Sequence, residues 1–190
     1  IDMIFGKNMI DADAINQYTG NDKFTVSLSD PTSTRQIVLN TTRDVLADKE
    51  VRQALQHATN KQTISEGIFY DLEQPADTLF AKTVPYCDID LEPYAYDVEL
   101  AQSMLDEAGW VVGSDKIREK DGQKLNIDLL YNSDSVTEKA IAEYLQSEYQ
   151  KIGIALNIHG EEEQSYRDNM KAGNFDMVFN ICWGTPYDPQ

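Results

Sequence analysis

Two aromatic residues that each carry one polar group, Trp183 and Tyr187, flank the turn Gly184-Thr185-Pro186. Side chains of this kind can line a binding pocket, because each offers an apolar ring and one hydrogen-bonding group. The apolar run at 175–181 predicts a strand before the turn, and α/β sheets usually bind ligands beyond the carboxyl ends of their strands. The pattern therefore predicts a ligand loop. Two aromatic side chains that only cover the end of a sheet would leave the same pattern.

A second cluster combines His159 with the acidic run Glu161-Glu162-Glu163. One imidazole and several carboxylates could hold a metal ion. Adjacent acids on a beginning helix point in different directions, however, and acids in a first turn are favoured by the helix dipole. We therefore prefer a helix start to a metal site. His57 lies within an amphipathic helix and has no acidic or sulfur neighbour one turn away, so we predict a structural role for it.

Motifs of enzymes are missing from the sequence. It contains no nucleophile elbow, phosphate loop or His-Glu-x-x-His motif, and no serine or cysteine has a base close in sequence. Asp44 and Asp48 could imitate a glycosidase pair, but such pairs arise by chance in a chain with 33 acidic residues. Cys182 has no cationic neighbour to activate it and is better explained as a packed thiol. An enzyme, most simply a hydrolase, is the minority hypothesis.

Composition sets the class of protein. The chain has 190 residues, of which 41% are hydrophobic and 26% charged, which is ordinary for one globular domain with a sizeable core. No apolar run approaches the roughly 20 residues that a transmembrane helix needs. A formal net charge of -17 opposes binding to nucleic acid or to an anionic membrane surface. Cys87 and Cys182 lack zinc-ribbon spacing, and a disulfide between them stays open.

The first half of the chain predicts helices and an antiparallel strand pair. The apolar alternation at 24–28 and the β-branched run at 36–39 read as strands, joined by turn residues at 29–33. Asp48 can cap a strong amphipathic helix. The expected elements are a short strand at 1–5, a helix at 11–18, the strands 24–28 and 36–39, helices at 48–58 and 64–70, and a long ordered loop at 71–96.

The second half alternates strands with helices. Asp121-Gly122 is a strong hairpin signal. Gly109 and Gly153 are helix stops, and Trp110 should pack on the core. The expected elements are a helix from 97 with Leu100, Ala101, Met104, Leu105 and Ala108 inward, a strand at 125–131, a helix with the buried stripe Val136, Ala140, Ile141, Tyr144, Leu145, Tyr149 and Ile152, a strand at 154–158, a helix at 162–172 and the strand 175–181. In that last strand, Met177, Phe179 and Ile181 should share one face, and Val178 and Asn180 the other. This order predicts an α/β fold with a mixed, largely parallel sheet and packed helices.

Several stretches together resemble the peptide and nickel solute-binding proteins of ABC importers, family 5. The run at 48–61 is similar to the family's helix of the form V-R-x-A-L-x-x-A-x-x-K, and 93–97 with Ala108-Gly109-Trp110 is similar to its tyrosine-aspartate helix. The stretches 77–81, 84–86, 117–123, 160–163 and 183–189 look most like the nickel-binding branch. Peptide-binding relatives usually carry an aspartate near the position of Pro186. An oligopeptide- or dipeptide-binding protein is the alternative.

The resemblance implies one lobe of a two-lobed binding protein of the type II fold, which closes about a hinge and is not an enzyme. It implies a nickel ion with an organic chelator as ligand, with no resident cofactor. Trp183, Gly184, Thr185, Pro186 and Tyr187 would line the pocket, and a metal-binding histidine lies beyond Gln190 in that branch, so no metal ligand is assigned to this chain.

The resemblance also implies a domain division and a cellular setting. Residues 1–22 would be a hinge-proximal strand and helix, and 23–190 a ligand-binding lobe that is incomplete at its carboxyl end. The protein would be a monomer that delivers its ligand to ABC permease subunits. Its place would be the periplasm, or the outer face of the cytoplasmic membrane as a lipoprotein.

Overall fold

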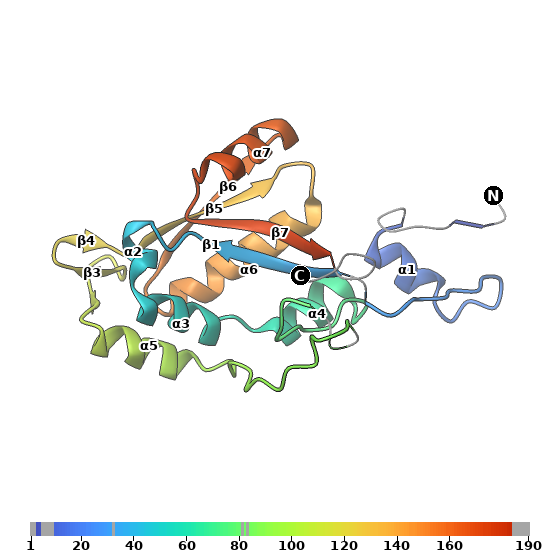
Figure 1. Cartoon of the computed structure of the whole chain (residues 1–190), viewed down its shortest axis with the longest axis horizontal. Coiled ribbons are helices and arrows are strands. Elements are labelled where there is room, and N and C mark those ends of the chain that lie inside the picture. The colour runs from blue at the N-terminus through green and yellow to red at the C-terminus, as the bar shows by residue number, and fades with distance from the viewer. Residues whose placement is uncertain (1–2, 5–9, 32, 81, 83, 184–190) are drawn as a thin grey trace.

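A computed structural model describes residues 3–4, 10–31, 33–80, 82 and 84–183. Figure 1 shows a body of helices packed on a sheet, with an amino-terminal arm that projects from it. The elements are α1 (Ala12–Tyr18), β1 (Ser33–Leu39), α2 (Asp44–Ala47), α3 (Lys49–His57), α4 (Lys61–Phe69), α5 (Val98–Glu107), β2 (Val111–Val112), β3 (Arg118–Lys120), β4 (Gln123–Lys124), β5 (Asn126–Asn132), α6 (Val136–Lys151), β6 (Ala155–Glu161), α7 (Glu163–Ala172) and β7 (Met177–Trp183).

The main sheet has the strand order β1-β7-β5-β6. β5 is parallel to both β6 and β7, and β1 is antiparallel to β7. The crossovers from β5 through α6 to β6, and from β6 through α7 to β7, are the connections that parallel strands require. The predicted mixed, largely parallel α/β sheet is therefore confirmed.

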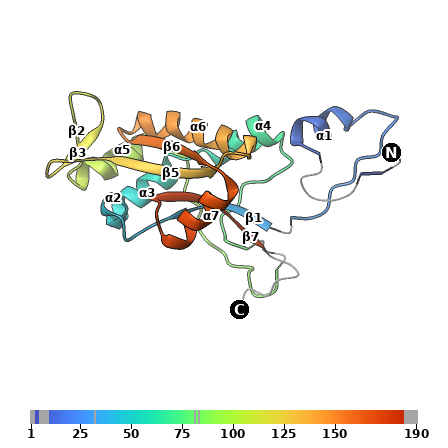
Figure 2. The ribbon, with the colours of Figure 1, turned by 90° about the horizontal axis from the view of Figure 1, so that it is seen from above.

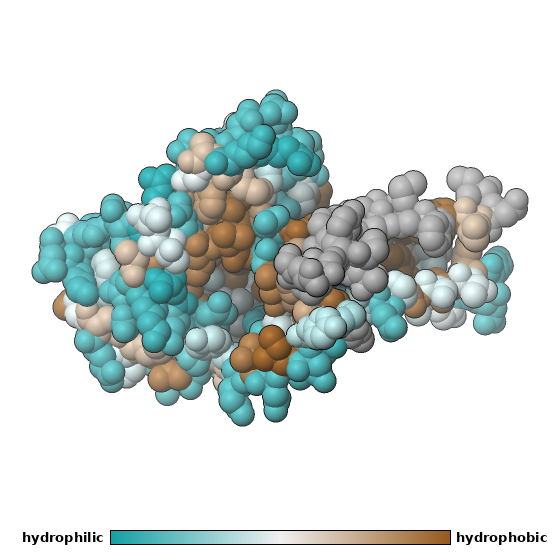
Figure 3. All heavy atoms as spheres, in the orientation of Figure 1, coloured by the Kyte–Doolittle hydropathy of each residue, from teal (hydrophilic) through white to brown (hydrophobic). Residues whose placement is uncertain are grey.

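Helices cover both faces of this sheet, as Figure 2 shows for α6 and α7 on opposite sides of the strands. The larger core lies on the α6 side and includes Met177 and Phe179 of β7. The smaller core lies under α7 and joins Val178 to Leu130 and Tyr166. Neighbouring residues of β7 thus face opposite cores, as the alternation predicted. On the face seen in Figure 3, hydrophilic side chains cover α7 and the hairpin, with apolar side chains in the hollow between them.

The helix boundaries follow from local chemistry. Asp48 caps α3 by accepting a hydrogen bond from the Glu50 amide at 3.0 Å. Gly109 and Gly153 adopt positive φ angles of 87° and 82° directly after helices, a conformation that favours glycine. Asn60 caps α4, so this helix begins at Lys61 and not at 64 as predicted. Lys61 and Gln62 extend the helix where a break was expected, because the Asn60 cap satisfies its first turn.

A small second sheet of order β2-β3-β4 projects from the body. Asp121 and Gly122 connect β3 to β4 with φ angles of 52° and 81°, as a two-residue hairpin turn requires. The predicted hairpin is confirmed. β2 pairs with β3 through only two residues and was not predicted, since a strand of that length leaves no readable pattern.

Two expectations fail, and a third is largely untested. Residues 24–28 form no strand in the part of the chain that is described, and β1 pairs with β7, not with them. Val136 and Leu100 are 82% and 41% exposed although both fit helical stripes, because each lies in a first helical turn that extends past the core. The strand expected at 1–5 lies largely outside the described residues. No described helix is long and apolar enough to cross a membrane.

Candidate functional site

The predicted ligand loop begins where β7 ends. Trp183 is the last residue of β7, and its backbone pairs with Ser33 of β1. The predicted strand before the loop is thus confirmed, and its end lies two residues later than expected. Gly184, Thr185, Pro186 and Tyr187 lie outside the described residues. Their role as ligand contacts, and that of Trp183, stays a prediction.

The parallel strands end together at this edge of the sheet, which we call the carboxyl edge. β5, β6 and β7 end at Asn132, Glu161 and Trp183. The Asn132 amide donates a hydrogen bond of 3.0 Å to the Glu138 carboxylate, and the Asn132 side chain donates to Glu163. One asparagine therefore positions carboxylates from both α6 and α7 at the edge where α/β sheets bind ligands.

Glu138 is a partly buried carboxylate at this edge. Burial raises its pKa, the Asn132 amide and the charge of Arg35 oppose that rise, and Glu163 adds to it. Arg35 extends from β1, donates two hydrogen bonds to Glu73 at 3.0 and 3.2 Å, and lies 5.4 Å from the ring centre of Phe69. A half-buried carboxylate beside a guanidinium group can accept a hydrogen bond from a polar ligand and respond to its charge.

Sequence reasoning missed Glu138 and Arg35. The signal for Glu138 was present, because Ser135 and Glu138 have the spacing of a capping box. Ser135 does cap α6, and its hydroxyl accepts a hydrogen bond from the Glu138 amide at 3.2 Å. The Glu138 side chain, however, turns to Asn132 instead of to the Ser135 amide. Nothing in the sequence indicated that Arg35 would lie near it.

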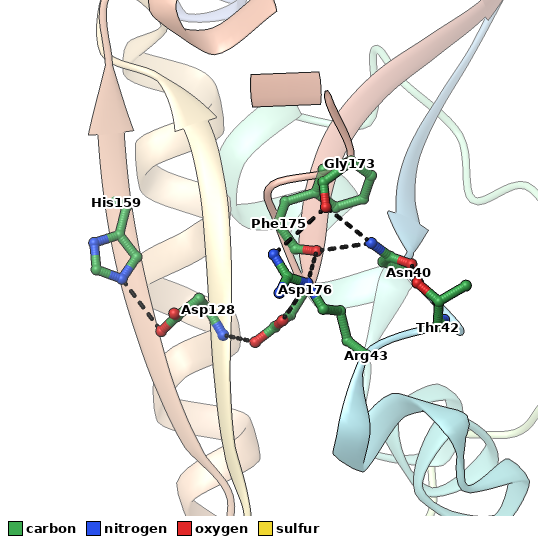
Figure 4. Close-up of polar contacts among 8 residues, drawn as sticks. All are labelled: Asn40, Thr42, Arg43, Asp128, His159, Gly173, Phe175 and Asp176. Carbon is green, nitrogen blue, oxygen red and sulfur yellow. Dashed lines mark hydrogen bonds and ion pairs between the residues drawn. The ribbon is translucent and has the colours of Figure 1, made fainter. Parts of the chain in front are cut away.

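A second polar cluster lies on the α7 face of the sheet, where β7 begins (Figure 4). It borders a cavity of about 230 Å³ lined by Arg43, Asp128, Leu130, His159, Glu161, Asn169, Asn174, Phe175 and Asp176. His159 contacts Asp128 at 3.3 Å, and Asp176 accepts a hydrogen bond from the Asp128 amide at 2.9 Å. The Asn40 side chain donates to the carbonyls of Gly173 and Phe175 at 3.1 and 3.2 Å. The Asn40 hydrogen bonds connect the end of β1 to the segment before β7.

The acidic run does not gather around His159, although Glu161 lines the same cavity. Glu161 accepts a hydrogen bond from Ser165, and Glu163 contacts Asn132 and Arg167. Within the described ranges, no group of three or more histidine, cysteine or acidic side chains could hold a metal ion. The polar groups of this cluster connect β1, β5 and the start of β7, and we take the carboxyl edge as the candidate site.

His57 contacts the end of the long loop at 71–96, which agrees with the structural role predicted for it. Its Nδ1 lies 2.8 Å from the Ala95 carbonyl oxygen, and its ring packs edge to face with Tyr94 at 5.2 Å. The Tyr96 hydroxyl donates a hydrogen bond of 2.7 Å to the buried Glu148. These contacts order the end of a loop that has no helix or strand among its described residues.

Asp48 joins several elements through its own hydrogen bonds. Burial raises its pKa, but hydrogen bonds from Glu50, Trp110 and Lys120 outweigh that effect and hold the pKa below its usual value. The Trp110 indole and the Lys120 ammonium group each lie 3.3 Å from Asp48 Oδ2. The Asp48 carboxylate thus links α3 to Trp110 and to the hairpin.

The two cysteines are both free thiols, and Cys87 is buried.

Comparison with known families gives a match over nearly the whole chain. Residues 4–190 match the family described as bacterial extracellular solute-binding proteins, family 5 Middle. The nickel-binding periplasmic protein of Escherichia coli (strain K12) is 37% identical over 191 residues, which is 100% of this chain and 36% of that protein. Oligopeptide-binding protein AppA of Bacillus subtilis (strain 168) is 30% identical over 146 residues, or 73% of this chain and 26% of that protein.

Solved structures share the fold. NikA from Brucella suis, crystallised in complex with Fe(III)-EDTA, has a TM-score of 0.89 at 42% identity over 95% of this chain and 36% of that chain. NikZ from Campylobacter jejuni in complex with Ni(L-His) has a TM-score of 0.81 at 27% identity over 95% of this chain and 35% of that chain. The chain thus spans about a third of the length of the proteins that it matches.

Proposed function

Because this chain belongs to the family 5 bacterial extracellular solute-binding proteins, we propose that it is one lobe of the binding protein of a nickel ABC importer. The ligand would be a nickel ion with an organic chelator, enclosed between this lobe and a second one. The bound ligand would shift the population toward the state closed about the hinge, which permease subunits would then recognise. The proposed setting is the periplasm, or the outer face of the cytoplasmic membrane.

One observation carries the choice of ligand. The nickel-binding relative matches 100% of this chain at 37% identity, whereas the oligopeptide-binding relative matches 73% at 30%. Pro186 adds to this choice, because it occupies the place near which the peptide-binding branch usually has an aspartate to hold an ammonium group. The matched proteins are named for binding, so the proposed activity is capture and not turnover.

Calorimetry on the longer protein tests nickel against peptide. We expect heat of binding with nickel plus histidine and none with a mixture of dipeptides at the same concentrations. A peptide ammonium group would lose its hydration on entering the pocket without gaining a carboxylate partner, and such a loss costs several kcal/mol. Nickel alone and histidine alone are the controls. Tight binding of dipeptides would contradict the assignment and favour the oligopeptide alternative, and turnover of ester or glycoside substrates would require an enzyme.

Trp183 should report ligand binding in the longer protein. We expect nickel-histidine to change the tryptophan fluorescence of the parent and to leave that of Trp183→Ala unchanged, because the ring would lie against the chelate. Trp110→Phe is the matched control, since Trp110 is buried beside Asp48 and this variant should keep the response. A response of equal size in Trp183→Ala would remove Trp183 from the site.

A further inference from the structure

Tyr70 ends α4 in a backbone conformation that bulky residues rarely adopt. Its φ and ψ angles of 52° and 39° are left-handed, and Asp71 follows with a φ angle of 60°. Glycine or asparagine is usual directly after a helix, because a Cβ atom makes the left-handed conformation costly. Gly173 occupies this position after α7 with a φ angle of 71°. A tyrosine here is an outlier, and a strained outlier indicates a role for its side chain.

The surrounding contacts hold the turn after α4 in place. The Asp71 amide donates a hydrogen bond of 3.1 Å to the Ser65 carbonyl. The buried Ser65 hydroxyl donates to the Glu73 carbonyl at 2.6 Å and lies 3.3 Å from Asp71 Oδ1. Arg35 of β1 donates two hydrogen bonds to the Glu73 carboxylate. Strained backbone persists only where its surroundings determine it, so these contacts fix the direction in which Tyr70 leaves α4.

The Tyr70 side chain reaches α1, the helix of the amino-terminal arm. Its hydroxyl donates a hydrogen bond of 3.2 Å to Asp13 Oδ1. α1 and α4 are in contact, and Figure 1 and Figure 2 both show them beside each other. No residue of α1 is buried. No other hydrogen bond joins residues 10–31 to the described residues from 34 onward. Tyr70 thus supplies the hydrogen bond that holds α1 against α4.

The arm is connected within itself and lies where a hinge is expected. Tyr18 of α1 packs on Phe24, with ring centres 4.8 Å apart, which joins α1 to the segment that leads to β1. The resemblance to family 5 places residues 1–22 near the hinge. The superposition on NikA in complex with Fe(III)-EDTA covers 95% of this chain at a TM-score of 0.89, so it includes most of the arm. The arrangement of arm and body therefore resembles that of a relative in complex.

We propose that Tyr70 is a positioning residue, which acts on ligand binding by setting the angle between the lobes through its hydrogen bond with Asp13. The bond would stabilise the closed state relative to the open one. A ligand that needs a sparsely populated state binds more weakly by the fraction of protein in that state. Any loss of closed-state stability would therefore appear in the affinity. The proposal rests on the proposed function, because it needs two lobes and a hinge.

Titration calorimetry of the longer protein with nickel plus histidine tests this role. Tyr70→Phe removes the hydroxyl and keeps the ring. It should weaken binding about threefold to tenfold and change the Tm of the ligand-free protein by less than about 2 °C. Tyr18→Phe is the matched control, because Tyr18 packs on Phe24 through its ring, and this variant should bind as the parent does. Equal affinities of Tyr70→Phe and the parent would overturn the proposal.

Variants of Asp13 show whether Tyr70 acts through this one bond. Asp13→Asn keeps a side-chain oxygen that can accept from the Tyr70 hydroxyl, so its affinity should stay near that of the parent. Asp13→Ala removes the acceptor and should weaken binding as Tyr70→Phe does. It also removes the contact of Gln17 with Asp13 Oδ2, and the double variant controls for that loss. Adding Tyr70→Phe to Asp13→Ala should change nothing further, because both substitutions remove the same bond. Additive losses would overturn the proposal.

Failure of the proposed function gives a different result. A parent that binds nickel-histidine no better than Tyr70→Phe does would overturn the role of Tyr70 and leave the proposed ligand standing. If the parent does not bind nickel-histidine, hydrogen exchange of the ligand-free longer protein decides. Tyr70→Phe should then raise the exchange rates of the α1 amides at least about threefold. Unchanged rates in this variant would overturn the proposal.

Discussion

Nickel-histidine should bind the 190-residue chain at least about a thousandfold more weakly than it binds the longer protein. A ligand enclosed between two lobes loses most of its surface to both walls. On this lobe alone, one side of the ligand would stay in water and every contact of the other wall would be lost. The loss of half of the contacts commonly costs several kcal/mol, and each 1.4 kcal/mol is tenfold in affinity. The metal-binding histidine that the resemblance places beyond Gln190 would also be missing.

The comparison is meaningful because the chain contains its own core. Residues of α3, α5, α6 and the main sheet bury one another within the chain. Titration calorimetry of both proteins in one buffer measures the difference, with circular dichroism of the chain as the control for folding. Comparable affinities would mean that the whole site lies on this lobe. Glu138, Glu163 and Arg35 at the carboxyl edge, and His159 with the acidic run, would then be the first positions to substitute.

Arg118→Met should lower the free energy of unfolding by about 3 kcal/mol, the second largest effect expected. The Arg118 side chain is 3% exposed. It donates hydrogen bonds to the carbonyls of Ile152 at 2.8 Å and Trp110 at 2.6 Å, and contacts Asp106 at 2.5 Å. Methionine keeps much of the apolar stem but leaves the buried carbonyls without donors. The hairpin would lose its attachment to the ends of α5 and α6.

Urea unfolding of this chain measures the effect, and Arg167→Met is the matched control. Arg167 pairs with Glu163 one helical turn away, with 69% of its side chain exposed. Exposed pairs of this kind contribute little, so the control should stay within about 0.5 kcal/mol of the parent. A similar loss in both variants would show that removal of any arginine destabilises this acidic chain, and that the buried contacts of Arg118 are not the cause.

Helix caps and turns were predictable from the sequence because they depend on residues within one turn of each other. Asp48 caps α3, Gly109 follows the end of α5 with a positive φ angle, and Asp121-Gly122 forms the hairpin turn. The alternation of strands and helices after residue 125 likewise determined a largely parallel sheet, since parallel neighbours need helical crossovers. Buried stripes were correct in the helix centres and wrong at Leu100 and Val136, where the core ends.

Strand pairing was decided only by the tertiary structure. The segment 24–28 and the run that became β1 are close in sequence, and their patterns fit an antiparallel pair. β1 instead pairs with β7, which lies more than a hundred residues later in the sequence. The alternation of apolar and polar residues predicts that a segment has an apolar face, but it does not predict which strand or which lobe will cover that face.

The candidate site divides in the same way. The sequence by itself determined that Trp183 ends a strand before a turn, because the apolar run and the glycine and proline that follow it are local signals. Only the tertiary structure brought Arg35 of β1 near Glu138 of α6 and joined Asn132 to Glu163 of α7. These residues lie on four separate elements, and each has an ordinary local role. Their meeting depends on parallel strands that end at one edge, which no spacing within the sequence specifies.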